Sequence, residues 1–135
     1  MQEKFDEWNE IKKQINSSQT LKYPSVGKIY WCSVGYNVGR EVYGKGDRFR
    51  RPVLVLNAFK NGMFFGIPLS SQTKNKTGFM FYKFKDNQGR EQVALFGQAK
   101  HFDIKRILQY MGKISKIELK AIKKKFAENI VGVDR

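Results

Sequence analysis

The sequence predicts a mainly β fold with helices, in which a small, strongly curved antiparallel barrel carries a C-terminal helix and an extra N-terminal helix. Two observations predict the barrel: short β-prone segments fill residues 27–112, and turns containing glycine and asparagine separate them at short intervals. A third observation predicts the helices, because apolar residues recur at helical spacing over residues 3–16 and again after residue 115. At 135 residues the chain has the length of one domain.

Residues 1–22 are predicted to form an amphipathic helical extension. Phe5, Trp8 and Ile15 fall on one side of a helix over residues 3–16, with charged residues between them. The Tyr23-Pro24 step ends the pattern, because the residue before a proline is driven out of the helical region. We expect this helix to pack on the barrel; a wider dimer contact and control of access to a groove are the alternatives.

The middle of the chain is predicted to form short antiparallel strands. The β-prone segments are 28–34, 52–57, 63–67, 79–84, 92–96, 99–102 and 107–111. Lys60-Asn61-Gly62 is typical of a tight hairpin turn, and Asp86-Asn87-Gln88-Gly89 predicts a second hairpin. No internal repeat or low-complexity segment interrupts this zone.

A helix is predicted to begin at Ser115. Ser115 and Glu118 have the spacing of a capping box, in which the hydroxyl and the carboxylate accept hydrogen bonds from the first free backbone amides. The apolar face is predicted to comprise Ile117, Leu119, Ile122, Phe126 and Ile130. The lysines at 116, 120 and 123–125 indicate a solvated face more than a nucleic-acid site.

The positive charge lies in the body of the chain. The formal net charge is +14, and residues 1–22 carry four lysines and four acids, so the whole excess belongs to residues 23–135. Such a field favours a polyanionic partner, because cations that displace counterions from phosphates gain affinity. A lysine-rich solvated surface and an acidic protein partner are the alternatives.

Most enzyme classes find no support among the residue types present. The single Cys32 can form no disulfide within the chain, and the single histidine, His101, reads as structural. Neither a glycine-rich phosphate loop nor a cluster of metal-ligand residues is present, so we expect no metal and no cofactor. The aliphatic run Val53–Leu56 is too short to span a bilayer, and we expect a cytoplasmic protein with no membrane contact.

Cleavage of RNA is compatible with this composition. The attacking group is the 2′-hydroxyl of the substrate, so the protein has only to align it, assist proton movement and stabilise a charged transition state. Arg48, Arg50 and Arg51 form a basic loop before Pro52, and the segment Pro68-Leu69-Ser70-Ser71-Gln72 ends the next strand. Two neighbouring strand ends would thus place guanidinium and hydroxyl groups where they can grip a phosphodiester.

An ordered series of short motifs resembles the MazF/PemK toxin family over about residues 24–131. The segments that carry the resemblance are Gly27–Trp31, Asn37–Glu41, Arg51–Val55, Pro68–Gln72, Val93–Leu95, Gln98 and Gly112–Ser115. The resemblance implies a barrel related to SH3 folds, of the type shared by MazF and CcdB toxins, in a homodimer. It also implies a sequence-selective, metal-independent endoribonuclease held inactive by a cognate antitoxin. Residues 23–135 would form this domain.

Transferred to this sequence, the family motif implies that Arg51 and Ser70 are the catalytic pair. A guanidinium offers paired donors to phosphate oxygens and stays charged, so Arg51 would stabilise the phosphorane. The family more often has threonine at the position of Ser70. Glu41, in the matching Asn-x-Gly-x-Glu loop, is the carboxylate candidate for the proton acceptor, with a loop-ordering salt bridge as the alternative.

Further substrate contacts are expected along two loops and beyond them. The basic and polar candidates are Lys45, Arg48, Arg50, Ser71, Gln72, Lys74, Lys76 and Gln98. Tyr36, Tyr43 or Phe49 could stack on unpaired bases, whereas Tyr30 and Trp31 are expected to pack in the core.

Two other functions remain open at this point. A barrel of this type can act without catalysis by poisoning a DNA topoisomerase, as CcdB toxins do, although such a protein would not need the basic Arg48–Arg51 entrance beside Ser70. A nonenzymatic RNA-binding module would retain RNA without creating new ends. The expected partners of the nuclease are single-stranded RNA, an acidic antitoxin and a second copy of the chain.

Overall fold

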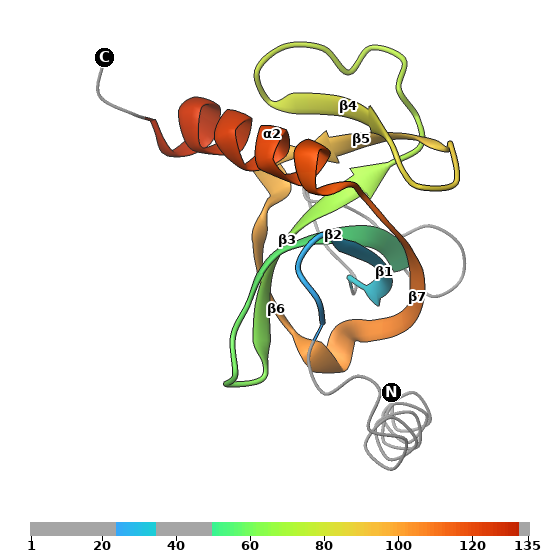
Figure 1. Cartoon of the computed structure of the whole chain (residues 1–135), viewed down its shortest axis with the longest axis vertical. Coiled ribbons are helices and arrows are strands. Elements are labelled where there is room, and N and C mark those ends of the chain that lie inside the picture. Colours follow the sequence, from blue (N-terminus) through green and yellow to red (C-terminus); the bar gives the residue numbers. More distant parts are fainter. Residues whose placement is uncertain (1–23, 35–49, 133–135) are drawn as a thin grey trace.

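A computed structural model describes residues 24–34 and 50–132 of the chain. Figure 1 shows the elements. The strands are β1 (Lys28–Ser33), β2 (Arg50–Ala58), β3 (Met63–Ser70), β4 (Phe81–Lys85), β5 (Glu91–Leu95), β6 (Lys100–Asp103) and β7 (Ile107–Lys113). The helical elements are η2 (Phe96–Gln98), η3 (Ile104–Arg106), α2 (Lys116–Phe126) and η4 (Ala127–Val131). The predicted antiparallel β fold with a C-terminal helix is confirmed; the predicted N-terminal helix lies outside the described residues.

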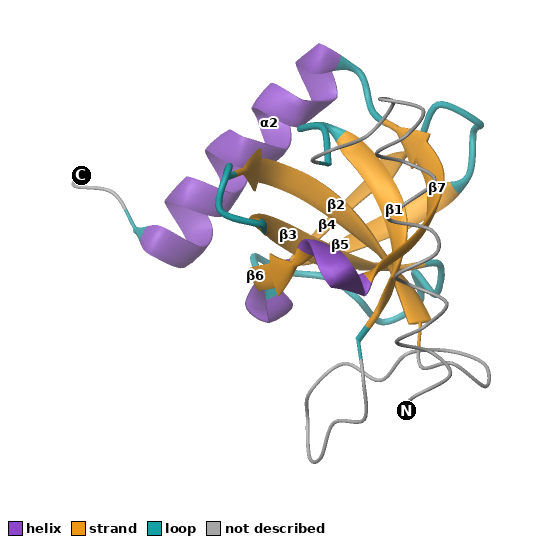
Figure 2. Ribbon diagram, turned by 90° about the horizontal axis from the view of Figure 1, so that it is seen from below, coloured by secondary structure: helices purple, strands orange, loops and turns teal. Residues whose placement is uncertain are grey.

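The strands form one antiparallel sheet that curls strongly. Their order is β4-β5-β3-β2-β1-β7, and β6 pairs with the first half of β3, on the edge whose last two residues pair with β5. The strands follow one another in the row β6-β3-β2-β1-β7. The single turn η3 connects β6 directly to β7, so the two outer strands of this row are adjacent in the chain. This row makes a small barrel, with β4 and β5 extending from the end of β3 and α2 along one side (Figure 2).

The two predicted hairpin turns are present. Gly62 has a φ of 88°, which favours glycine, and the side-chain oxygen of Asn61 accepts a hydrogen bond from the Met63 amide over 3.1 Å. In the turn between β4 and β5, the carboxylate of Asp86 accepts hydrogen bonds from the backbone amides of Gln88 and Arg90. The sequence predicted the position of this turn but not the part played by Asp86.

Strand β2 is buried on both faces over Val53–Leu56, which explains its unbroken apolar run. Val53 and Val55 belong to a cluster inside the barrel, whereas Leu54 and Leu56 belong to a second cluster beneath α2. Tyr30 and Phe64 fill the barrel cluster, and Tyr30 is buried as predicted.

Helix α2 begins as predicted but turns a different face to the core. The Ser115 Oγ accepts a hydrogen bond from the Glu118 amide over 3.0 Å. The Glu118 carboxylate instead accepts one from the Tyr82 hydroxyl, so the reciprocal half of the capping box is absent. Ile122 is fully buried, but Ile117 is 83% exposed and was wrongly assigned to the apolar face. Ile117 precedes Ile122 by five positions, and residues at that offset point in different directions on a helix, so Ile117 lies outside the stripe of Leu119, Ile122 and Phe126.

The end of the helical segment also departs from the predicted face. Residues Ala127–Val131 wind as a π-helix, and Ile130 is 36% exposed. The wider turn changes the direction of each side chain relative to α-helical spacing. The predicted solvated face is confirmed, because Lys116, Lys120 and Lys123–Lys125 are all exposed.

Candidate active site

Arg51 and Ser70 lie at neighbouring ends of β2 and β3. Val53 pairs with Pro68, and continuing that register by two residues in each strand places Arg51 opposite Ser70. Side chains directly opposite each other in an antiparallel pair project to the same face of the sheet. The two residues that the sequence singled out therefore share one face at one end of the barrel. Strand β2 begins at Arg50, so Arg50 and Arg51 lie in the strand and not in the predicted loop.

The Arg51 guanidinium is tied to the strand that carries Ser70. Its Nη1 donates a hydrogen bond to the carbonyl oxygen of Leu69 over 3.3 Å. The residue is half-buried, and this burial lowers the pKa of the guanidinium from its usual value. A partly desolvated guanidinium interacts more strongly with a phosphate than one in bulk water, because the local dielectric is lower.

The Ser70 hydroxyl is held by the turn that follows it. Its Oγ accepts a hydrogen bond from the Gln72 backbone amide over 3.1 Å, and the residue is only 4% exposed. A hydroxyl that accepts from an amide still has its own hydrogen to donate. The local turn therefore fixes the oxygen while leaving its proton available for a further partner.

Arg50, which precedes Arg51 in β2, projects to the opposite face of the strand and stacks on an aromatic ring. The guanidinium carbon of Arg50 lies 5.1 Å from the centre of the Trp31 ring. Trp31 is half-buried, so the expectation that it packs in the core was wrong for this residue. Arg50 is exposed, and cation–π contact restrains a long side chain that would otherwise be free in solvent.

The other predicted contacts are spread more widely. Ser71, Gln72 and Lys74 are exposed in the segment after β3, Lys76 is half-buried in the same segment, and Gln98 is half-buried in η2. Glu41, Lys45 and Arg48 lie outside the described residues, as do Tyr36, Tyr43 and Phe49.

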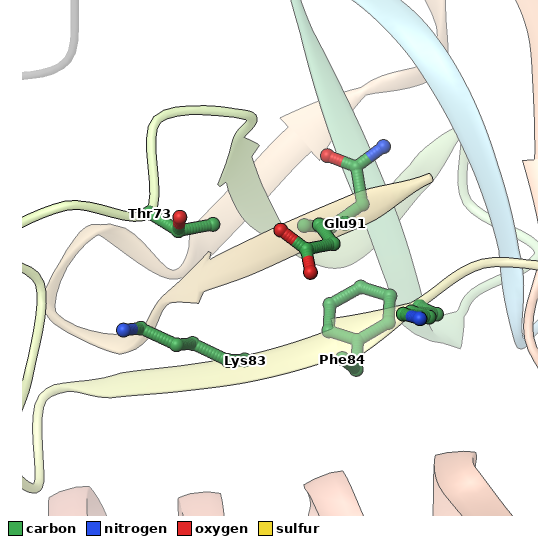
Figure 3. A pocket seen from close by; sticks show the side chains of 6 residues that line it. Thr73, Lys83, Phe84 and Glu91 are labelled. Atoms are coloured by element: carbon green, nitrogen blue, oxygen red, sulfur yellow. The ribbon is translucent and has the colours of Figure 1, made fainter. Parts of the chain in front are cut away.

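The face that carries Ser70 continues across two further strands. Ser70 is paired with Val93 of β5, and Val93 is paired with Lys83 of β4, so all three residues lie in one row. An open pocket of about 320 Å³ lies at the end of this row, lined by Thr73, Lys83, Phe84, Lys85, Glu91 and Gln92. Figure 3 shows the Glu91 carboxylate directed into the space bounded by Thr73, Lys83 and Phe84. The sequence reading missed this pocket; the signal was the pairing of Lys85 with Glu91 across the predicted hairpin.

Metal-ligand groups and membrane-spanning helices are both absent from the described residues. No group of three or more histidine, cysteine, aspartate or glutamate side chains is gathered there in a way that could hold a metal ion. None of the helices in this part of the chain has the length and apolar character needed to cross a membrane.

The chain is similar to known proteins in sequence and in fold. Residues 25–130 match the sequence model of the PemK-like, MazF-like toxins of type II toxin-antitoxin systems. A search of curated protein sequences finds no match to the chain. Among solved structures, MazF from Deinococcus radiodurans is 21% identical, covering 82% of this chain and 97% of its own, with a TM-score of 0.64.

Two mycobacterial structures have the same fold. An endoribonuclease in complex with its cognate antitoxin is 14% identical, covers 83% of this chain and 98% of its own, and has a TM-score of 0.63. A second endoribonuclease is 11% identical, covers 80% and 91%, and has a TM-score of 0.59. At these identities the likeness concerns the fold, whereas the family follows from the sequence match over most of the chain. The chain belongs to the PemK-like, MazF-like toxin family of type II toxin-antitoxin systems.

Proposed function

We propose that this chain is a sequence-selective endoribonuclease toxin that cuts single-stranded RNA in the cytoplasm without a metal ion. The observation that carries the proposal is the hydrogen bond from the Arg51 guanidinium to the carbonyl oxygen of Leu69, the residue before Ser70. The β2–β3 register, extended by two residues from Val53 and Pro68, supports it. Membership of a toxin family gives the biological setting. Residues 23–135 would form the nuclease domain, and residues 1–22 an extension to it.

In the proposed reaction the 2′-oxygen of a ribose attacks the adjacent phosphorus while the 5′-oxygen of the next nucleotide leaves. The products are a 2′,3′-cyclic phosphate and a 5′-hydroxyl. Arg51 stabilises the negative charge that gathers on the phosphorane oxygens, because its two parallel N–H groups match a phosphate. The Ser70 hydroxyl, at the end of β3, donates a hydrogen bond to the reacting phosphate group.

Proton transfer is assigned to Glu41 on the family motif alone. Its carboxylate would take the proton of the 2′-hydroxyl, and solvent would protonate the leaving oxygen. The path of the RNA is assigned to Lys45, Arg48, Arg50, Ser71, Gln72, Lys74, Lys76 and Gln98. Lysine and arginine side chains in this set neutralise backbone phosphates, which predicts strong dependence of binding on salt.

The proposed partners are an acidic antitoxin and a second copy of the chain. The formal charge of +14 favours an acidic protein that covers the cationic face and competes with RNA. A relative with this fold has been solved as an endoribonuclease with its cognate antitoxin, which supports the same arrangement here. The homodimer is proposed from the family.

The test is incubation of the purified protein with single-stranded RNA in excess EDTA. We expect new fragments whose 5′-hydroxyl ends accept radiolabel from a polynucleotide kinase without prior phosphatase treatment. Intact RNA would refute the nuclease and leave two alternatives that the same preparation separates. Retention of uncut RNA on the protein indicates a binding module, whereas inhibition of a DNA topoisomerase without RNA binding indicates a CcdB-like poison.

A further inference from the structure

We infer that the pocket formed by Thr73, Lys83, Lys85 and Glu91 receives a guanine base that lies one or two nucleotides from the cut. This inference rests on the proposed nuclease function and adds to it a base preference and the residues that determine it. Three features of the pocket support it: its position, its charged groups and its chemistry.

Three residues that line the pocket, Lys83, Lys85 and Glu91, belong to the face of the sheet that carries Ser70. Ser70, Val93 and Lys83 are neighbours in one row across β3, β5 and β4. Adjacent strands are about 4.8 Å apart, so Lys83 lies about 10 Å from Ser70 across the sheet. One or two nucleotides of an extended single strand span this distance, and the base next to the reacting phosphate can therefore reach the pocket.

The charged groups that line the pocket form no ion pair with one another among the described residues. Glu91 pairs with Lys85 in the register of the hairpin, and Lys83 lies two residues away on the same face. No ion pair joins Glu91 to either lysine in the described residues, although all three side chains are exposed. A carboxylate and two ammonium groups that line one open pocket thus remain available to a ligand.

This combination of charges fits guanine better than the other bases. A carboxylate accepts hydrogen bonds only, and guanine presents two adjacent donors, N1–H and the N2 amino group, on its Watson–Crick edge. Lysine donates to the O6 and N7 acceptors of guanine. Adenine and cytosine offer one amino group on this edge, and uracil offers one imino group, so each leaves part of the carboxylate unpaired.

The decisive experiment compares guanine with inosine, which lacks only the N2 amino group. The probes are fluorescein-labelled 2′-O-methyl oligonucleotides, which lack a free 2′-hydroxyl and are not cut. Each contains one guanine, inosine, adenine, cytosine or uracil at the varied position, and affinity is measured by fluorescence anisotropy. We expect the wild-type protein to bind the guanine probe about tenfold more tightly than the inosine probe.

Matched variants locate the effect. In Glu91→Gln the guanine and inosine probes should bind with equal affinity, because the carboxylate that accepts from N2 is gone. Glu128→Gln removes a carboxylate from η4, outside the pocket, and should keep the preference. Equal affinity for guanine and inosine in the wild-type protein would overturn the inference, as would an unchanged preference in Glu91→Gln.

Sequencing the ends of digested RNA separates this inference from the nuclease itself. Cutting with guanine enriched at one fixed position, and loss of that enrichment in Glu91→Gln, supports both. If the protein cuts RNA with no guanine enriched at a fixed position, the nuclease function stands and the inference that the pocket binds guanine is refuted. If the protein does not cut, the nuclease fails, and the anisotropy series on the uncut probes still decides whether the pocket selects guanine.

Discussion

The Arg51 guanidinium donates a hydrogen bond to the carbonyl oxygen of Leu69, the residue that precedes Ser70. This bond joins the end of β2 to the end of β3 and restricts the rotation of a long side chain before substrate binds. Preorganised charge contributes more to catalysis than charge that must be gathered during the reaction. The pairing of β2 with β3 therefore positions the guanidinium before substrate binds.

Arg51→Ala should reduce the rate of RNA cutting by about a hundredfold to a thousandfold, the usual effect of losing one transition-state donor. Folding should be unaffected, because the residue is half-buried and lies at a strand end. Cutting is measured on a labelled RNA, and circular dichroism monitors the fold. Arg106→Ala, at an exposed arginine of η3, is the control. Wild-type cutting by Arg51→Ala would contradict the assignment.

Ser70→Ala should reduce cutting and also loosen the turn after β3. The substitution removes the oxygen that accepts from the Gln72 amide, which should cost about 1 kcal/mol of unfolding free energy. Urea denaturation measures this loss. Thr77→Ala alters an exposed hydroxyl of the same segment, outside the proposed RNA path, and should change neither stability nor cutting.

Ser70→Thr separates the hydroxyl from the rest of the side chain. Threonine keeps the oxygen and stiffens its rotamer, so cutting should remain above that of Ser70→Ala. The residue is 4% exposed, and the added methyl group must find room in a packed site. If the alanine and threonine variants cut equally slowly and are equally stable, the hydroxyl has no part in the reaction.

The positions of the strands and of both hairpins followed largely from local signals in the sequence, and the failures are local too. Both hairpins could be predicted because their turns need particular residues: Gly62 has a positive φ, and the side chains of Asn61 and Asp86 accept hydrogen bonds from turn amides. The start of β2 was misplaced at Pro52. Arginines carry no strand signal, and only pairing of Arg50 with Ser33 extends the strand to include them.

The candidate site was predictable only where motif residues lie at strand ends. Arg51 and Ser70 could be paired because consecutive hairpin strands bring their ends together. The Glu91 pocket needed a longer inference, since β5 joins β3 only at Leu69 and Ser70 while β6 occupies the other half of that edge. That β5 and β6 share one edge of β3 cannot be predicted from any local sequence pattern.

Asp86→Asn should destabilise the protein by about 2 to 3 kcal/mol, because hydrogen bonds to a charged group are lost in a buried turn. Burial alone would raise the pKa of Asp86, but hydrogen bonds from Arg90, Gln88 and Gln92 outweigh it and lower the pKa. A lowered pKa gives stability that is present above the pKa of the unfolded chain. That stability is lost as the pH falls through the pKa of the folded protein.

The pH dependence provides the check on Asp86. Urea midpoints of the wild type should fall steeply below about pH 4, whereas those of Asp86→Asn should fall less. Glu91→Gln on the same hairpin is the control, since Glu91 is exposed and should leave the curve unchanged. Parallel curves for the wild type and Asp86→Asn would rule out this source of acid sensitivity.

Ile122→Ala should cost about 2 to 5 kcal/mol, because it empties a fully buried position between α2 and the sheet. Ile117→Ala should change stability by less than about 0.5 kcal/mol, since the side chain is 83% exposed. The pair uses the same chemical change in one helix and is compared by urea denaturation. Equal losses would mean that α2 turns a different face to the barrel.

Arg50→Ala should weaken RNA binding by about 1 kcal/mol, roughly fivefold, without a change in base preference. Its guanidinium stacks on Trp31 and is exposed, so it is positioned to neutralise one phosphate. Loss of one such contact should reduce the slope of log affinity against log salt by about 0.7 for a single strand. Lys116→Ala, at an exposed lysine of α2, should leave the slope unchanged.

Tryptophan fluorescence reports on the same contact without relying on cutting. The chain has two tryptophans, so Trp8→Phe leaves Trp31 as the single emitter. Titration with an uncut 2′-O-methyl oligonucleotide should change the Trp31 emission, because a phosphate drawn to Arg50 alters the cation that lies over the ring. The change should disappear in the double variant with Arg50→Ala. If anisotropy shows binding but the Trp31 emission does not change, the RNA binds elsewhere on the barrel.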